Sequence, residues 1–64
     1  MSIKVEVQDQ HGGWHKFQGG LPNSGPSIKR AMETAMKQSP LAKKSKKVRA
    51  VDEKTGSLVD MLMG

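Results

Sequence analysis

A run of lysines between residues 43 and 47 offers the clearest chemistry in this sequence. Four of its five side chains are ammonium groups, which bind the phosphates of nucleic acids and displace their counterions. The run has no arginine and no aromatic residue, so it predicts electrostatic affinity without recognition of particular bases. A solvated linker, whose charges prevent strand pairing, is the alternative. The predicted phosphate contacts are Lys16, Lys29, Arg30, Lys43, Lys44, Lys46 and Lys47.

Trp14 is the only tryptophan, and it stands two residues before Lys16. An exposed indole among basic side chains is a stacking surface for an unpaired base, or an anchor for a protein partner. A lone tryptophan in a small domain also serves to cap the core, and this structural role is the alternative. The sequence therefore predicts that Trp14 binds a base when its ring lies outside the core.

The remaining polar residues form no recognisable catalytic set. His11 and His15 lie four positions apart across a turn and a strand, and no third residue has a spacing suited to a metal site. The six acids are scattered, cysteine is absent, and no nucleotide-binding or nucleophile motif is present. A chain of 64 residues also has little volume for a water-excluding pocket. We therefore expect a protein that is not an enzyme and has no metal or cofactor.

The balance of charge favours an anionic partner. Eleven Lys and Arg against six Asp and Glu give a net charge of +5, which favours nucleic acid first and an acidic protein second. Solubility alone is the simpler explanation of that charge. The start of the chain lacks the apolar segment of a signal peptide, and no apolar run approaches the ~20 residues of a membrane span. A cytoplasmic protein without a membrane segment is expected.

Residues 26–38 carry the pattern of an amphipathic helix. Apolar side chains recur at intervals of three and four residues, so they share one face. Pro26 suits the first helical turn, and Ser39 precedes a proline, which pushes it out of the helical region. The methionines on this face predict core packing, with an adaptable binding groove as the alternative. The predicted buried face consists of Ile28, Ala31, Met32, Ala35 and Met36.

Alternating apolar residues on both sides of this helix predict two β-hairpins, over residues 2–18 and 48–63. In the first hairpin, a loop over 10–12 sets Val5 opposite Phe17, and it leaves Trp14 on the outer face of the sheet. A four-residue loop would bury the indole instead, and a bulge at the glycines would permit that register.

In the second hairpin, a loop over 53–56 pairs chemically matched residues. Val51 then faces Leu58, and Arg49 faces Asp60 as a pair of opposite charge. The face toward the helix carries Val48, Ala50, Val59 and Met61, and the apolar residues of the other face are Val51, Leu58 and Leu62.

This outer apolar face provides the alternative function. Val51, Leu58 and Leu62 would form a patch beside Trp14, suited to a protein partner or to a second copy of the chain. The short, basic layout resembles that of domains encoded by bacteria and phages, which favours an inhibitor or accessory factor of a larger complex. A small domain without disulfides also gains stability by dimerising, so a homodimer is a further expectation.

Together these elements predict one α+β domain over residues 1–64. Its order is β-β-α-β-β, with a four-stranded, mainly antiparallel sheet of two hairpins and one helix packed on one face. Residues 43–47 are expected to form a basic linker between the helix and the second hairpin. The predicted function is that of a small basic nucleic-acid-binding module, with protein interaction as the alternative.

Overall fold

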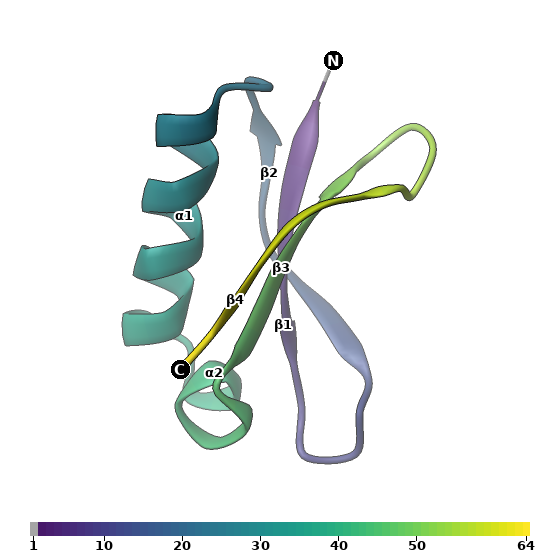
Figure 1. Cartoon of the computed structure of the whole chain (residues 1–64). Coiled ribbons are helices and arrows are strands. Elements are labelled where there is room, and N and C mark those ends of the chain that lie inside the picture. The colour runs from purple at the N-terminus through teal and green to yellow at the C-terminus, as the bar shows by residue number, and fades with distance from the viewer. Residues whose placement is uncertain (1) are drawn as a thin grey trace.

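The computed structural model, which describes residues 2–64, is a four-stranded antiparallel sheet with helices on one face (Figure 1). The sheet has the strand order β2-β1-β3-β4, so the two hairpins meet through antiparallel pairing of β1 with β3. The predicted α+β class and β-β-α-β-β order are confirmed, with a short second helix added. The elements are β1 (Ile3–Gln8), β2 (Trp14–Leu21), α1 (Gly25–Gln38), α2 (Pro40–Ser45), β3 (Lys47–Asp52) and β4 (Leu58–Met63).

Helix α1 has close to its predicted bounds because prolines stand at both ends. Pro26 lies in the first turn, and Ser39 has an extended conformation before Pro40. The Ser39 N–H donates to the carbonyl of Ala35 at 2.9 Å, and the same residue is the N-cap of α2. The predicted apolar face is confirmed, since Ile28, Ala31, Met32 and Ala35 are buried and Met36 is partly buried against the core.

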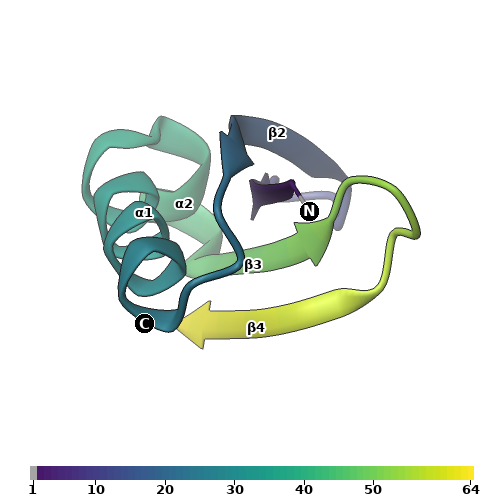
Figure 2. The same ribbon diagram turned by 90° about the horizontal axis from the view of Figure 1, so that it is seen from above.

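The core lies between the helices and the two central strands. Both helices cover the same face of the twisted sheet, and β2 and β4 form its opposite edges (Figure 2). Small side chains on both helices allow their backbones to approach the sheet closely. The buried residues of this core are Ile3, Val5, Val7, Ile28, Ala31, Met32, Ala35, Ala42, Val48 and Ala50.

The first hairpin has the predicted register next to its turn and a different one beyond it. Gln8 pairs with Trp14 as predicted, so the indole lies on the sheet face away from the helices. A bulge then sets Val5 opposite Gln18 instead of Phe17. Phe17 still packs, half-buried, against the margin of the core.

The second hairpin departs from its predicted register beyond the Val51–Leu58 pair. Val51 faces Leu58 as predicted. Val59 is then an extra residue in a bulge, which shifts every later pair by one position. Since side chains alternate between the two faces of a sheet, this shift turns each following residue to the other face.

The shifted register corrects several predictions. Arg49 faces Met61 instead of Asp60, so the predicted charge pair between Arg49 and Asp60 is wrong. Val48 faces Leu62, which therefore packs against the core and does not lie on the outer face. Met61 was predicted on the face toward the helix, but it points away from the helices and is exposed.

Candidate nucleic-acid interface

The lysine run is part of the folded structure, and its prediction as a linker is wrong. Lys43 and Lys44 lie in the last turn of α2, and Lys47 begins β3. Between them, Lys46 has a left-handed conformation at φ 57° and donates its N–H to the carbonyl of Ala42 at 2.7 Å. Glycine commonly closes a helix in this way. Because Ala42 is fully buried in the core, α2 fixes the backbone of the run at one end of the molecule.

Five exposed lysines gather at this end. Lys37 in the last turn of α1 joins the four lysines of the run, because α2 packs beside the C-terminal end of α1 (Figure 1). Cations here also offset the partial negative charge at the C-terminal ends of both helices. We call this group the basic end, which consists of Lys37, Lys43, Lys44, Lys46 and Lys47.

Within residues 2–64, no carboxylate forms an ion pair with a lysine of the basic end. All the ion pairs of that part of the chain belong to the sheet and its two turns, at distances of 2.7–3.5 Å. The five ammonium groups therefore remain free to bind an anion. The ion pairs are Lys4–Glu6, Arg49–Glu6 and Lys16–Glu53, and His15–Asp9 joins them when the imidazole is protonated.

Lys29 and Arg30 lie apart from the basic end. Lys29 stands eight residues before Lys37 on α1, which separates the two by about 12 Å along the helix axis at ~1.5 Å per residue. Arg30 lines a separate depression with Gln18 and Leu21 at the end of β2. The structure therefore does not bring these two residues together with the lysine run.

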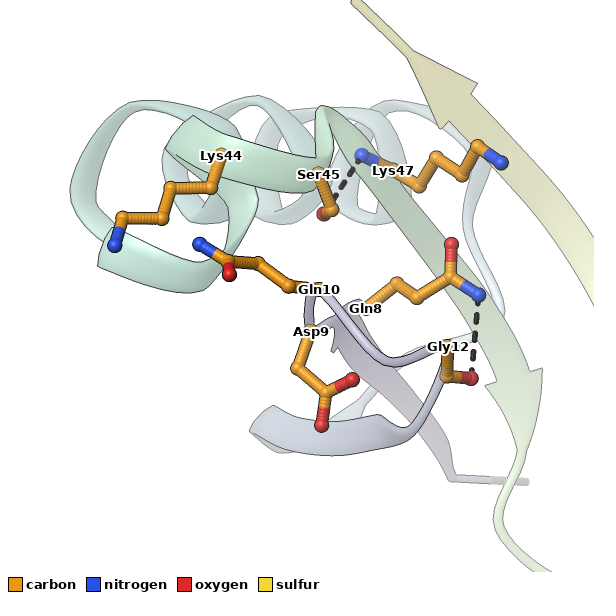
Figure 3. Close-up of a pocket in the computed structure, with 7 residues that line it drawn as sticks. All are labelled: Gln8, Asp9, Gln10, Gly12, Lys44, Ser45 and Lys47. Atoms are coloured by element: carbon orange, nitrogen blue, oxygen red, sulfur yellow. Dashed lines mark hydrogen bonds between the residues drawn. The ribbon is translucent and has the colours of Figure 1, made fainter.

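A shallow polar depression lies between the basic end and the turn of the first hairpin (Figure 3). Lys44 and Lys47 approach it from α2 and β3. The Lys47 N–H donates to Ser45 Oγ at 3.3 Å, and the Gln8 amide donates to the Gly12 carbonyl at 3.2 Å. The lining residues are Gln8, Asp9, Gln10, Gly12, Lys44, Ser45 and Lys47.

Asp9 is the one acid in this lining, and it is occupied by its own turn. Its Oδ1 accepts the N–H groups of His11 and Gly13, both at 2.8 Å, and its Oδ2 lies 2.7 Å from His15 Nε2. The His15 hydrogen bond, followed by that of Gly13, lowers the pKa of Asp9 from its ordinary 3.8 to about 2. Figure 3 shows the carboxylate pointing away from both lysines, which leaves their charges to an incoming anion.

Trp14 is half-buried on the outer sheet face, where Arg49 covers one side of its ring. The Arg49 guanidinium carbon lies 4.2 Å from the ring centroid, which is the arrangement of a cation–π contact. Arg49 Nε also donates to Glu6 Oε1 at 2.8 Å, and Lys4 Nζ lies 3.5 Å from Glu6 Oε2. Glu6 is 8 % exposed. This network holds the indole in place and leaves at most one ring face for a base.

Trp14 and the basic end share one row across the sheet. Gln8 pairs with Trp14 in β2, and Val7 pairs with Val48 in β3, so the residue next to Gln8 in β3 is Lys47. These side chains lie on the face away from the helices. Strands are about 4.8 Å apart, which separates Trp14 from Lys47 by about 10 Å.

Lys16 lies on the same strand as Trp14 but has a local partner. Its Nζ is 3.5 Å from Glu53 Oε1 in the turn of the second hairpin. Both side chains are partly exposed to solvent, so this ion pair is weak. The charge of Lys16 is therefore partly neutralised before any ligand binds.

The apolar residues predicted for a protein partner do not form one patch. Val51 is 3 % exposed, and Leu62 packs against the core, so only Leu58 of that group is accessible. Trp14 begins β2, at the edge of the sheet opposite Leu58 in β4. Apart from Leu58, the sequence pattern missed the exposed apolar surface that does exist, because the bulge at Val59 redirects the rest of β4. That surface consists of Leu58, Val59, Met61 and Met63.

Three further observations concern metal-binding clusters, membrane-spanning helices and similarity to known proteins. Among residues 2–64, no three His, Cys, Asp or Glu side chains come together as a metal site would require. No helix in that range is long and apolar enough to cross a membrane. Comparison of the chain with protein-family models, curated proteins and solved structures found no match.

Proposed function

We propose that this protein is a small, non-enzymatic module that binds nucleic acid through the basic end. The observation that carries the proposal is the gathering of five exposed lysines, none ion-paired within residues 2–64, on a folded platform. Free ammonium groups gain affinity from the phosphate backbone by displacing its counterions. With no arginine in the group, the contact is electrostatic and reads no base sequence.

Trp14 adds a preference for single strands in this proposal. A base stacked on the uncovered face of the indole would lie about 10 Å from Lys47 across the sheet. A neighbouring phosphate of a flexible strand can span that separation, whereas the bases of a duplex are stacked and unavailable. Lys44 and Lys47 would then hold phosphates at the polar depression beside the first turn.

The experiment is a fluorescence titration of single-stranded oligonucleotide at several salt concentrations, following Trp14. Four or five lysine contacts, at ~0.7 each on a single strand, predict a slope of log affinity against log salt of about −3 to −3.5. Trp14→Ala, measured with a labelled oligonucleotide, should weaken binding by about 1–3 kcal/mol and leave the slope unchanged. Absence of binding even at low salt would refute the proposal.

A charge-matched pair of variants separates the basic end from general positive charge. Changing Lys43, Lys44 and Lys47 together to Gln should make the slope shallower by about 2, at ~0.7 per contact on a single strand. The control changes Lys29, Arg30 and Lys54 to Gln, which removes the same charge elsewhere and should leave most of the slope intact. Equal losses in both variants would mean that net charge, not the basic end, drives binding.

Protein interaction is the second candidate, favoured by the exposed apolar side chains of β4. Leu58 is 58 % exposed and Met63 is 66 % exposed, and apolar side chains in such a group suit a protein partner. Apolar association responds much less to salt than phosphate binding does. A partner whose affinity is nearly constant between low and high salt would therefore favour this second function.

A further inference from the structure

The outer side of β4 offers backbone groups to another strand. Gly64 N–H donates to the Lys46 carbonyl at 2.9 Å, so Gly64 is directed toward β3. Backbone groups of an antiparallel strand alternate in direction, so those of Met61 and Met63 point away from β3. Met61 N–H accordingly donates to the Asp60 carboxylate at 2.8 Å. Among residues 2–64, no strand pairs with this side of β4.

The side chains of this strand are unusually apolar for an edge. Leu58 and Met63 are more than half exposed, and Val59 and Met61 are each 41 % exposed. Natural edge strands are normally protected by charges, prolines or bulges, because a flat apolar edge pairs with other chains. Here the bulge lies at Val59, and the charge nearest the free edge is Asp60.

We propose that β4 pairs with β4 of a second copy of this chain, antiparallel about a two-fold axis at Leu62. This is a self-complementary contact, in which each strand offers the same residues to the other. The outward groups of Met61 hydrogen-bond those of Met63 of the second copy, and the reverse pair follows by symmetry. The two Leu62 side chains meet on the helix side and join the two cores. This inference does not depend on nucleic-acid binding.

The charges select this register over its neighbours. An axis at Asp60 would set two carboxylates opposite each other, and an axis at Met61 would set each Asp60 opposite Leu62. With the axis at Leu62, Asp60 lies opposite Gly64 of the second copy, and that Gly64 is hydrogen-bonded to Lys46 just before β3. A Cβ at Gly64 would lie 3.4 Å from Lys46 Cβ, so Lys46 shares the face of Gly64. Each dimer therefore forms two Asp60–Lys46 contacts between copies.

In the monomer, the Asp60 side chain protects the free edge of β4 from pairing with another strand. Its carboxylate occupies the Met61 N–H, which a pairing strand must take over. In the dimer, the carboxylate leaves this N–H and turns to Lys46 of the second copy. Three features limit the affinity of the dimer. The Asp60 carboxylate must first leave the Met61 N–H, the ladder of residues 60–64 is short, and each copy carries a net charge of +5. A dissociation constant of about 10–100 µM is expected for so small an interface.

Analytical ultracentrifugation from micromolar to millimolar concentration tests the dimer. The chain should shift from its 7.0 kDa monomer toward twice that mass. Met61→Lys places a charge on an exposed edge position, and it should weaken association at least ~10-fold. The control Gln18→Lys adds the same charge to β2 at the other edge of the sheet, and it should leave association unchanged. A strict monomer at 1 mM, or equal association of Met61→Lys and the unaltered chain, overturns the proposal.

A charge exchange tests the register. Asp60→Lys and Lys46→Asp should each abolish association, because each sets like charges against one another across the axis. The double variant restores opposite charges and should dimerise within ~3-fold of the unaltered chain. Within one copy Lys46 lies beside Gly64, four residues along the chain from Asp60, so an intrachain contact does not explain such a rescue. A double variant that stays monomeric overturns the Leu62-centred register.

Discussion

The two edges of this sheet are protected to very different extents. Strand β2 has two register breaks, a glycine pair and an end that bends so that Leu21 reaches the core. The ion pair of Lys16 with Glu53 and the hydrogen bond of His15 with Asp9 lie along it. Strand β4 has one bulge and is otherwise a regular ladder with exposed apolar side chains. Bulges and charges discourage strand addition, so β4 is the more open of the two edges.

The contrast shows how a small domain divides its surface. The first hairpin holds Trp14 with its charged neighbours, and the α2–β3 junction beside it holds free lysines. The apolar side chains that the core cannot contain remain on β4. A chain of 64 residues has a large surface relative to its volume, so it covers only part of its apolar residues by itself. Association through β4 would complete that coverage.

The largest expected effect concerns the core that both edges share. Met32 is 2 % exposed on α1, so Met32→Ala should lower the free energy of unfolding by about 2–4 kcal/mol. Such a loss threatens a domain of this size and should loosen both edges together. Urea unfolding followed by circular dichroism measures it. Glu33→Ala on the exposed side of α1 is the control, with a change within about 0.5 kcal/mol. An unchanged midpoint for Met32→Ala would contradict the packing described.

Much of the fold was predictable because period alone determines which face an element buries. The apolar spacing of α1 and the alternation of β1 placed Met32 and Val5 in the core. The prolines at 26 and 40 fixed the helix bounds. The turn residues also placed the second loop correctly, since Asp52 N–H donates to the Ser57 carbonyl at 2.9 Å.

The bulges were not predictable, and they decided where the candidate surfaces lie. Val59 carries no signal of a bulge, because a β-branched residue suits a regular strand equally well. Its insertion turned Leu62 toward the helices and Met61 toward the outer face, so it changed which apolar residues are exposed. The stacking of Arg49 on Trp14 was missed for a related reason, since it depends on β1 lying between β2 and β3. Sequence separation conceals such contacts.

The second prediction compares the stability contributed by an ion pair at the sheet centre with that of an ion pair at the β2 edge. Glu6 is 8 % exposed and accepts a charged hydrogen bond from Arg49 at 2.8 Å. Glu6→Gln should therefore cost about 1.5–3 kcal/mol of unfolding free energy, and Trp14 fluorescence should change as Arg49 loses its anchor. Glu53→Gln removes the matching acid from the exposed pair with Lys16 and should cost less than about 1 kcal/mol. Equal costs would remove the distinction between centre and edge.

The third effect concerns the bend that closes β2. Gly20 has φ +65° and open space around its missing Cβ. Gly20→Ala should therefore cost about 1 kcal/mol through backbone conformation alone. Gly25→Ala is the matched control, because Gly25 also has open space but no positive φ. It should be neutral or slightly stabilising. Thermal unfolding of the two variants side by side measures the difference, and equal midpoints would mean that the positive φ of Gly20 carries no cost.

The smallest effect is the pH dependence of the turn that leads into β2. Asp9 is partly exposed and has a pKa lowered to about 2, chiefly by its hydrogen bond with His15. Because the unfolded chain binds this proton near pH 3.8, the ionised Asp9 stabilises the fold fully above about pH 4. That contribution is lost as the pH falls from 4 toward 2. Asp9→Asn should flatten this part of the stability curve and lower the stability above pH 4, where the ionised Asp9 contributes fully. Urea midpoints between pH 2 and 6 measure both curves, and parallel curves would show that Asp9 titrates alike in the folded and unfolded chain.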